Sequence, residues 1–248
     1  MCGRYAVTLP DDAMRQIFAT DNLIQSVPRY NIAPTQPVIA IWIDDAMRRT
    51  AKLARWGLVP GWVKDPREFP LLVNARAETM ADKPAFRDSV KHKRCILPAS
   101  GYYEWQTLPG GKKQPHYITL KDDEPLALAG LYSSWMGPDG EEIDTVATIT
   151  VPAGPDVAHI HDRMPALMRG HQIDAWLDTK AMRFAEVQPF VVPQPEDTMA
   201  SHPVSTRVNS AANEGPYLIV PVSEVLDDGP DDKSMAVKAK KSAQLDLF

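Results

Sequence analysis

Cysteine is scarce in this sequence, and long apolar runs are missing from it. Cys2 and Cys95 are the two cysteines among 248 residues. Two cysteines cannot build a disulfide framework or a four-cysteine zinc site, which fits a reducing compartment. No apolar run approaches the roughly 20 residues that span a bilayer, and the N-terminus lacks the charged and apolar regions of a signal peptide. We therefore expect a cytoplasmic protein without a membrane segment.

Positive charge is also in deficit over the whole chain. The formal net charge of -5 argues at first against a polyanionic partner such as DNA. The distribution is uneven, however: residues 51–100 hold ten Lys and Arg against five Asp and Glu, and residues 101–150 hold three against eight. Because binding responds to the local field over about 10 Å, a basic groove on an acidic protein is allowed. A solvated surface is the ordinary alternative.

The composition is that of a soluble globular protein, with 44% hydrophobic and 24% charged residues. Twenty-three prolines argue for ordered loops and short elements rather than long helices. Apolar residues with a period of two predict strands, and apolar residues at helical spacing predict helices. We expect strands at 2–7, 38–43, 52–58, 95–97, 101–105, 116–120, 127–133 and 145–151, helices at 11–18 and 170–186, a loop at 28–37 and a short buried run at 71–73.

Cys2 stands directly after the initiator methionine. Loss of Met1 would leave a residue with both a free α-amine and a thiol. An α-amine has a pKa of about 7.7 to 8.0 against about 10.4 for lysine, so it offers far more free base at neutral pH. Amine and thiol together convert an aldehyde into a five-membered thiazolidine ring. The ordinary interpretation is a chance cysteine on a frayed terminus.

Three polar residues in other segments stand out: Glu104 and His161 as candidates for proton transfer, and Asn74 as a candidate helix cap. Alternation along 101–105 places Glu104 opposite Tyr103 and Trp105, where partial desolvation would raise its pKa. His161 lies in a polar run between apolar segments and could act as an acid or base. The first two have ordinary alternatives, Glu104 a surface carboxylate and His161 a solvated turn, and a helix cap is the ordinary role for Asn74. No carboxylate or cysteine spacing near His161 completes a metal site, so we expect no metal and no cofactor.

Six short motifs occur in a fixed order along the chain. They are Cys2-Gly3-Arg4-Tyr5, Arg29-Tyr30-Asn31-Ile32-Ala33-Pro34, Trp56-Gly57-Leu58-Val59-Pro60, Asn74-Ala75-Arg76-Ala77-Glu78-Thr79, Tyr103-Glu104-Trp105 and His161-Asp162-Arg163-Met164-Pro165. Together they resemble the SOS-response-associated peptidase (SRAP) family, the abasic-site processing proteins that shield damaged single-stranded DNA. The match extends from Cys2 to about Val222.

The resemblance implies an α+β fold: one SRAP-like catalytic domain at 2–222, with barrel-like antiparallel sheets and short flanking helices. It implies that Cys2, freed of Met1, forms a thiazolidine crosslink with the ring-opened aldehyde of an abasic site. Glu104 would act as general acid and base, His161 as proton donor to the sugar oxygen, and Asn74 would orient the terminus. Weak lyase activity and self-removal of Met1 are also implied. The residues expected to contact DNA are Arg4, Pro34, Trp62, Arg76, Trp105 and Arg163.

The end of the chain carries a separate signal. Residues 224–242 are rich in charged and small side chains and have no aromatics, which predicts a disordered linker at 223–243. The last five residues, Gln244-Leu245-Asp246-Leu247-Phe248, resemble the peptide that docks bacterial DNA-repair proteins into the sliding clamp. Gln244 would be its polar lead, with Leu245, Leu247 and Phe248 as apolar contacts. A nucleoid-associated protein at replication forks is the implied location.

Two other functions fit the same residues. A cysteine peptidase could use Cys2 as nucleophile with His161 and Asn74. A non-enzymatic, clamp-tethered DNA-binding module would need no reactive cysteine. Replacement of Cys2 by serine separates these interpretations, because a serine terminus keeps the amine but forms no stable thiazolidine.

Overall fold

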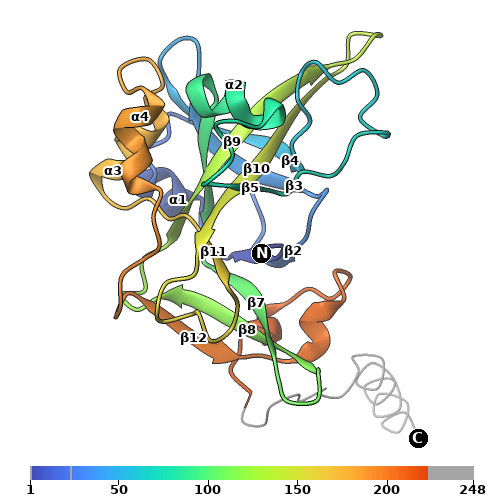
Figure 1. The fold of residues 1–248 in the computed structure, drawn as a ribbon, viewed down its shortest axis with the longest axis vertical. Helices are drawn as coiled ribbons and strands as arrows, with labels where there is room; N and C mark the ends of the chain where they lie inside the picture. The colour runs from blue at the N-terminus through green and yellow to red at the C-terminus, as the bar shows by residue number, and fades with distance from the viewer. Residues whose placement is uncertain (1, 23, 223–248) are drawn as a thin grey trace, which may run out of the picture.

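The protein was analysed as a computed structural model, which describes residues 2–22 and 24–222 (Figure 1). Five strands form a closed barrel in the order β10 (Glu142–Pro152), β4 (Arg49–Trp56), β3 (Pro37–Ile43), β6 (Arg94–Ala99) and β9 (Leu126–Met136), and β9 pairs back to β10. The predicted α+β fold with barrel-like sheets is confirmed. One feature departs from the expected antiparallel pattern, because β10 runs parallel to β4 and to β5 (Asn74–Arg76).

The second sheet has five antiparallel strands in the order β12 (Met199–Pro203), β8 (Lys113–Leu120), β7 (Gly101–Thr107), β1 (Tyr5–Val7) and β2 (Arg29–Ile32). It lies below the barrel in Figure 1. Its two faces bury different cores, as the alternation along β7 predicted. Tyr102 belongs to the main core, whereas Tyr103 and Trp105 pack in a smaller cluster on the opposite face.

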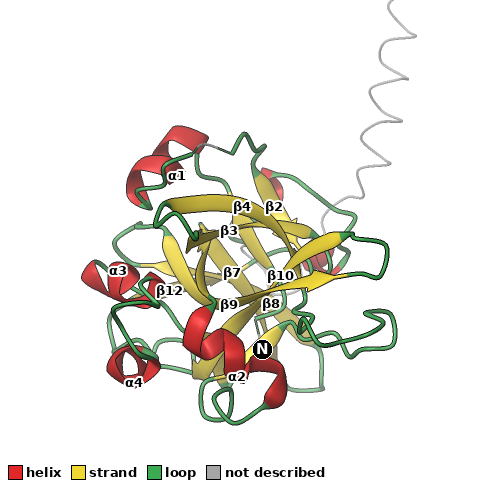
Figure 2. Cartoon of the chain, turned by 90° about the horizontal axis from the view of Figure 1, so that it is seen from above, coloured by secondary structure: helices red, strands yellow, loops and turns green. Residues whose placement is uncertain are grey.

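The helices are short and lie at the periphery of the strands (Figure 2). They are α1 (Asp11–Ile17), α2 (Pro84–His92), α3 (His171–Leu177) and α4 (Phe184–Val187), with 3-10 turns η1 (Gln188–Phe190), η2 (Thr206–Asn209) and η3 (Pro216–Leu218). None of the helices within the described residues is long and apolar enough to cross a membrane.

The predicted helix at 170–186 is wrong, because α3 and α4 are separate. Asp178 follows α3, and its carboxylate accepts hydrogen bonds from the backbone N–H groups of Lys180 and Ala181 at 3.1 and 2.8 Å. A side chain that binds its own following backbone offers an alternative to helical hydrogen bonds. The chain therefore turns at Asp178 before α4 begins.

Other expectations also need correction. The segment 28–37 was predicted as a loop, yet it contains β2, which pairs with β1. The run at 71–73 is not buried, since Leu71 is 47% exposed. Arg94, the last residue of the basic run 91–94, is fully buried and donates to the carbonyl of Trp176 at 2.6 Å. The predicted linker at 223–243 and the peptide at 244–248 lie outside the described residues.

Candidate active site

Strand β10 brings together segments that are far apart in sequence. At its C-terminal half, Thr150 pairs with Arg76 of β5 on one edge and with Pro165 of β11 (Arg163–Pro165) on the other. This is possible because β10 extends beyond the end of β4, its neighbour in the barrel. The last residue of β10 that pairs with β4 is Val146. The motifs around Asn74 and His161 therefore meet at one end of the barrel, beside the second sheet.

Cys2 is held at this junction by Asn74. The Asn74 side-chain Nδ2 donates to the backbone carbonyl of Cys2 at 2.9 Å, and the Cys2 side chain is fully buried. Asn74 lies in β5, so the helix-cap interpretation is wrong. Its Oδ1 atom is buried and has no hydrogen-bond partner within residues 2–22 and 24–222. Burial raises the pKa of the Cys2 thiol, and the nearby Glu104 carboxylate adds to the rise.

Glu104 and His161 form a carboxyl–imidazole pair at the same place. Glu104 Oε2 lies 4.0 Å from His161 Nε2. Glu104 is only 3% exposed, so it is not the surface carboxylate of the ordinary interpretation. Burial raises its pKa to about 7, and the Asp162 carboxylate contributes to the same rise. A carboxyl group with such a pKa can both accept and release a proton near neutral pH.

The backbone after His161 orients its ring. The Arg163 backbone N–H donates to His161 Nδ1 at 3.0 Å, which leaves Nε2 as the nitrogen that faces Glu104. Burial lowers the pKa of His161, while Asp162, 2.9 Å from Nδ1, opposes the shift. Burial therefore favours the uncharged ring, whose Nε2 faces the Glu104 carboxyl group.

The three arginines expected to hold phosphates have different surroundings. Arg163 is bound to the Glu78 carboxylate through both Nη atoms and donates to the Thr150 carbonyl at 2.5 Å. Arg76 is exposed. Together with Glu78, His161 and Arg163 it lines an open pocket of about 610 Å³. Of the carboxyl–imidazole pair, only His161 lines this pocket.

Arg4 points to the other side of the sheet. Its Nη1 donates to Asn31 Oδ1 at 2.6 Å and to the Val208 carbonyl at 2.7 Å, and its guanidinium lies 6.0 Å from the Trp105 ring centre. Trp105 donates from Nε1 to Asn209 Oδ1 at 2.7 Å. Arg4 and Trp105 thus lie near the site in sequence but on the opposite face of β7 from Glu104.

The two loop residues expected to meet bases lie apart from these groups. Trp62 is 62% exposed and makes an edge contact with Phe69, with ring centres 5.7 Å apart. Pro34 is half-buried in the turn between β2 and β3. The structure therefore brings Cys2, Asn74, Glu104 and His161 together and distributes the DNA-contact candidates around them.

Sequence reasoning did not assign roles to several residues that build the site. Glu78 belongs to a quoted motif, yet only the structure pairs it with Arg163. Asn31 also belongs to a motif, and it is fully buried next to Arg4. Thr150 had no signal, because an interior threonine in a strand has no distinctive pattern. These residues hold Arg163 and Arg4, and no spacing rule connects them.

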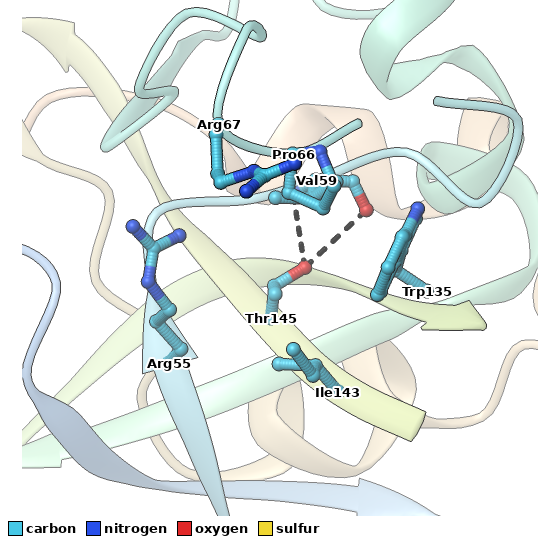
Figure 3. Close-up of a pocket in the computed structure, with 7 residues that line it drawn as sticks. All are labelled: Arg55, Val59, Pro66, Arg67, Trp135, Ile143 and Thr145. Atoms are coloured by element: carbon cyan, nitrogen blue, oxygen red, sulfur yellow. Dashed lines mark hydrogen bonds between the residues drawn. The ribbon is translucent and has the colours of Figure 1, made fainter. Parts of the chain in front are cut away.

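A second pocket, of about 250 Å³, lies near the loop that carries Trp62 (Figure 3). Arg55, Arg67 and Trp135 line it, and Thr145 Oγ1 accepts from the Val59 backbone N–H at 2.9 Å at its edge. None of the candidate catalytic residues lines this pocket. Within the described residues, no group of three or more His, Cys, Asp or Glu side chains is placed to hold a metal ion.

Comparison with known proteins gives consistent matches. The model of the family described as SOS response associated peptidase (SRAP) matches residues 1–211. The abasic site processing protein YoqW of Bacillus subtilis is 38% identical over 222 residues, which cover 88% of this chain and 99% of that protein. The abasic site processing protein HMCES of Gallus gallus is 36% identical over 202 residues, 72% of this chain and 59% of its own. A crystal structure of a Bacteroides thetaiotaomicron protein superposes with a TM-score of 0.76 at 25% identity, covering 89% of this chain and all of that one (100%).

Proposed function

Because this chain belongs to the SOS response associated peptidase family, we propose that it bonds covalently to abasic sites in single-stranded DNA through Cys2. The relatives named as abasic site processing proteins support the choice of lesion. The observation that carries the proposal is the placement of Cys2. Asn74 holds its carbonyl at 2.9 Å, and the buried Glu104 carboxyl group, paired with the half-buried His161 ring, lies beside it.

The first step is the removal of Met1 by hydrolysis of its peptide bond to Cys2. An amide nitrogen cannot form an imine, whereas the freed α-amine, with an ordinary pKa of about 7.7 to 8.0, can. Asn74 keeps the Cys2 carbonyl fixed during this change. The amine therefore starts its reaction from a defined position rather than from a mobile terminus.

Glu104 and His161 open the sugar ring. The Glu104 carboxylate accepts the proton of the anomeric hydroxyl while His161 donates its Nε2 proton to the ring oxygen, and the ring C–O bond breaks to give an aldehyde. The amine then attacks the aldehyde carbon and gives up its two protons, one to the former carbonyl oxygen and one to His161 Nε2, which restores the ring. Protonated Glu104 returns its proton to the departing hydroxyl. One water leaves, and a C=N bond to Cys2 forms.

The thiol completes the crosslink. Its sulfur adds to the imine carbon, the C=N electron pair moves to nitrogen, and the thiol proton ends on that nitrogen. The net change joins the aldehyde and the aminothiol with loss of one water, and no oxidant or reductant is consumed. A raised thiol pKa suits this order, because the thiol stays protonated until the imine has formed. Elimination of the 3′ phosphate from the imine would give the weak lyase activity.

A cysteine peptidase using Cys2, His161 and Asn74 is less well supported. A nucleophilic cysteine in such an enzyme needs a lowered thiol pKa and an asparagine that orients the histidine. Here burial raises the pKa of Cys2, and Asn74 binds the Cys2 carbonyl instead. Hydrolysis of the single Met1 bond remains part of the proposal.

The surrounding residues would bind the strand. Arg76 and Arg163 at the open pocket and Arg4 on the opposite face of the second sheet are the proposed phosphate contacts, since guanidinium groups match phosphate geometry. Trp62 would stack on bases, as exposed aromatics do in single-strand binding proteins, and Pro34 and Trp105 are the other proposed base contacts. The residues 244–248 would dock on a bacterial sliding clamp, which would raise the local concentration at replication forks.

The test is adduct formation with a single-stranded oligonucleotide that carries one abasic site. The native chain should give a heat-resistant adduct on a denaturing gel. Cys2→Ser should give only an adduct that needs borohydride reduction to survive heating, and Cys2→Ala should give at most a reducible one. A stable adduct from Cys2→Ala would remove Cys2 from the chemistry, and no adduct from the native chain would reject the proposal.

A further inference from the structure

Asn31 is a fully buried polar side chain outside the acid/base pair. It lies in β2, in the motif that begins at Arg29. Its Nδ2 group donates to the carbonyls of Ser210 and Asn213, each at 2.9 Å, and its Oδ1 accepts from Arg4 at 2.6 Å. One amide therefore connects the segment after η2 to the guanidinium that stands two residues beyond Cys2.

Arg4 is held by neutral oxygen atoms. Besides Asn31 Oδ1, its acceptors are the carbonyls of Val208 at 2.7 Å and Asn209 at 3.4 Å. Within residues 2–22 and 24–222, no carboxylate forms an ion pair with it. Arg163 and Arg67 differ, because each is paired with a carboxylate. The half-buried Arg4 thus keeps its full positive charge in a fixed position.

We infer that Asn31 is a positioning residue that presents Arg4, uncompensated and oriented, to a phosphate of the bound DNA strand. A carboxylate at position 31 would also orient the guanidinium, but it would cancel the charge that attracts the strand. An asparagine orients it without that cancellation. The inference rests on the proposed function in that it takes the ligand to be single-stranded DNA.

The Asn31 side-chain amide also binds the segment whose backbone carbonyls accept hydrogen bonds from Arg4. Asn31 binds Ser210 and Asn213, whose segment supplies the Val208 and Asn209 carbonyls to Arg4. The Asn31 side chain therefore fixes both the orientation of the Arg4 guanidinium and the position of the segment 208–213. This explains why a buried asparagine stands in a strand, where asparagine is ordinarily depleted.

Asn31→Asp tests the inference, because it keeps the size of the side chain and adds one charge at Arg4. The measurement is the affinity for an undamaged single-stranded oligonucleotide over a series of salt concentrations. One lost phosphate contact lowers the slope of log K against log salt by about 0.7, which is about fivefold in affinity at about 0.1 M salt. Arg4→Gln should lose the same amount. The double variant Arg4→Gln/Asn31→Asp should lose no more than either one.

Asn22→Asp is the matched control. Asn22 donates to the Ala51 carbonyl and accepts from the Ala51 N–H, both at 2.8 Å, beside β4 of the barrel. The control should keep the native slope. Asn31→Ser, which removes both contacts and adds no charge, should lower affinity about two- to threefold and keep the slope.

The outcomes separate the inference from its premise. A native slope in Asn31→Asp, an equal slope loss in Asn31→Ser, or additive losses in the double variant would each overturn the role of Asn31. Asn31→Ser also provides the answer if Asn31→Asp does not fold. Covalent adduct formation at saturating abasic DNA is measured on the same proteins. It should persist in Asn31→Asp, whereas its absence in the native chain would be a failure of the proposed function alone.

Discussion

Replacement of Glu104 by glutamine separates the chemistry of the site from its shape. The side chain keeps its size but can no longer exchange a proton. A positioned acid or base contributes about 10²- to 10⁴-fold to a rate. Glu104 is used in both ring opening and imine formation, so Glu104→Gln should form the adduct at least about 100-fold more slowly. Its affinity for undamaged single strands should match that of the native chain.

The same substitution should stabilise the fold at alkaline pH. Burial raises the pKa of Glu104 from an ordinary 4.5 to about 7, so the folded protein binds this proton more tightly than the unfolded chain does. The contribution of protonated Glu104 to the free energy of unfolding is therefore present in full below pH 4.5, and it is lost as pH rises through about 7. The difference corresponds to at most about 3 kcal/mol, at about 1.4 kcal/mol per pH unit. Glutamine carries no such cost at any pH.

Two assays check this prediction. Urea unfolding should show the variant more stable than the native chain at pH 8, by up to about 3 kcal/mol, and equal to it at about pH 4. The rate of adduct formation by the native chain should rise through pH 7, and this inflection should be missing in the variant. Equal adduct rates, or equal stability at pH 8, would show that Glu104 is not the buried proton-transfer group described here.

Three further substitutions test other parts of the structure. Asn74→Leu removes the donor to the Cys2 carbonyl, so adduct formation should slow by about 100-fold with unchanged DNA affinity, measured by gel kinetics and fluorescence anisotropy. Cys2→Ser should form an imine that borohydride traps at a rate within about tenfold of the native chain, because the amine attacks first. Arg94→Leu leaves the Trp176 and Met182 carbonyls without their donor, so the free energy of unfolding should fall by about 3 kcal/mol in urea titrations.

Local patterns were enough for part of this architecture. Alternation along 101–105 placed Tyr103 and Trp105 on one face and Glu104 on the other, and the structure confirms that arrangement. Strands that are nearly continuous apolar runs, such as β3 and β9, were found within a few residues of their ends. These features depend on neighbouring residues alone, which is the information that a sequence window contains.

Features that depend on distant segments were not predictable. Nothing local shows that β10 leaves β4 and pairs with β5 and β11, although this pairing assembles the site. Arg94 follows two lysines in the basic run 91–94, and only the position of α3 and its following turn makes it a buried donor. Asn74 has the chemistry of a helix cap, and it became a strand residue because β10 offered it a partner.

The intact mass of the adduct tests the central claim most directly. The native protein is incubated with an oligonucleotide carrying one abasic site and then denatured. The mass of the adduct is measured by intact mass spectrometry without a reduction step. The account predicts the mass of the chain from Cys2 plus the mass of the oligonucleotide less one water, with the bond mapped to Cys2 by peptide analysis. An adduct that retains Met1, or one mapped to a lysine, would contradict it.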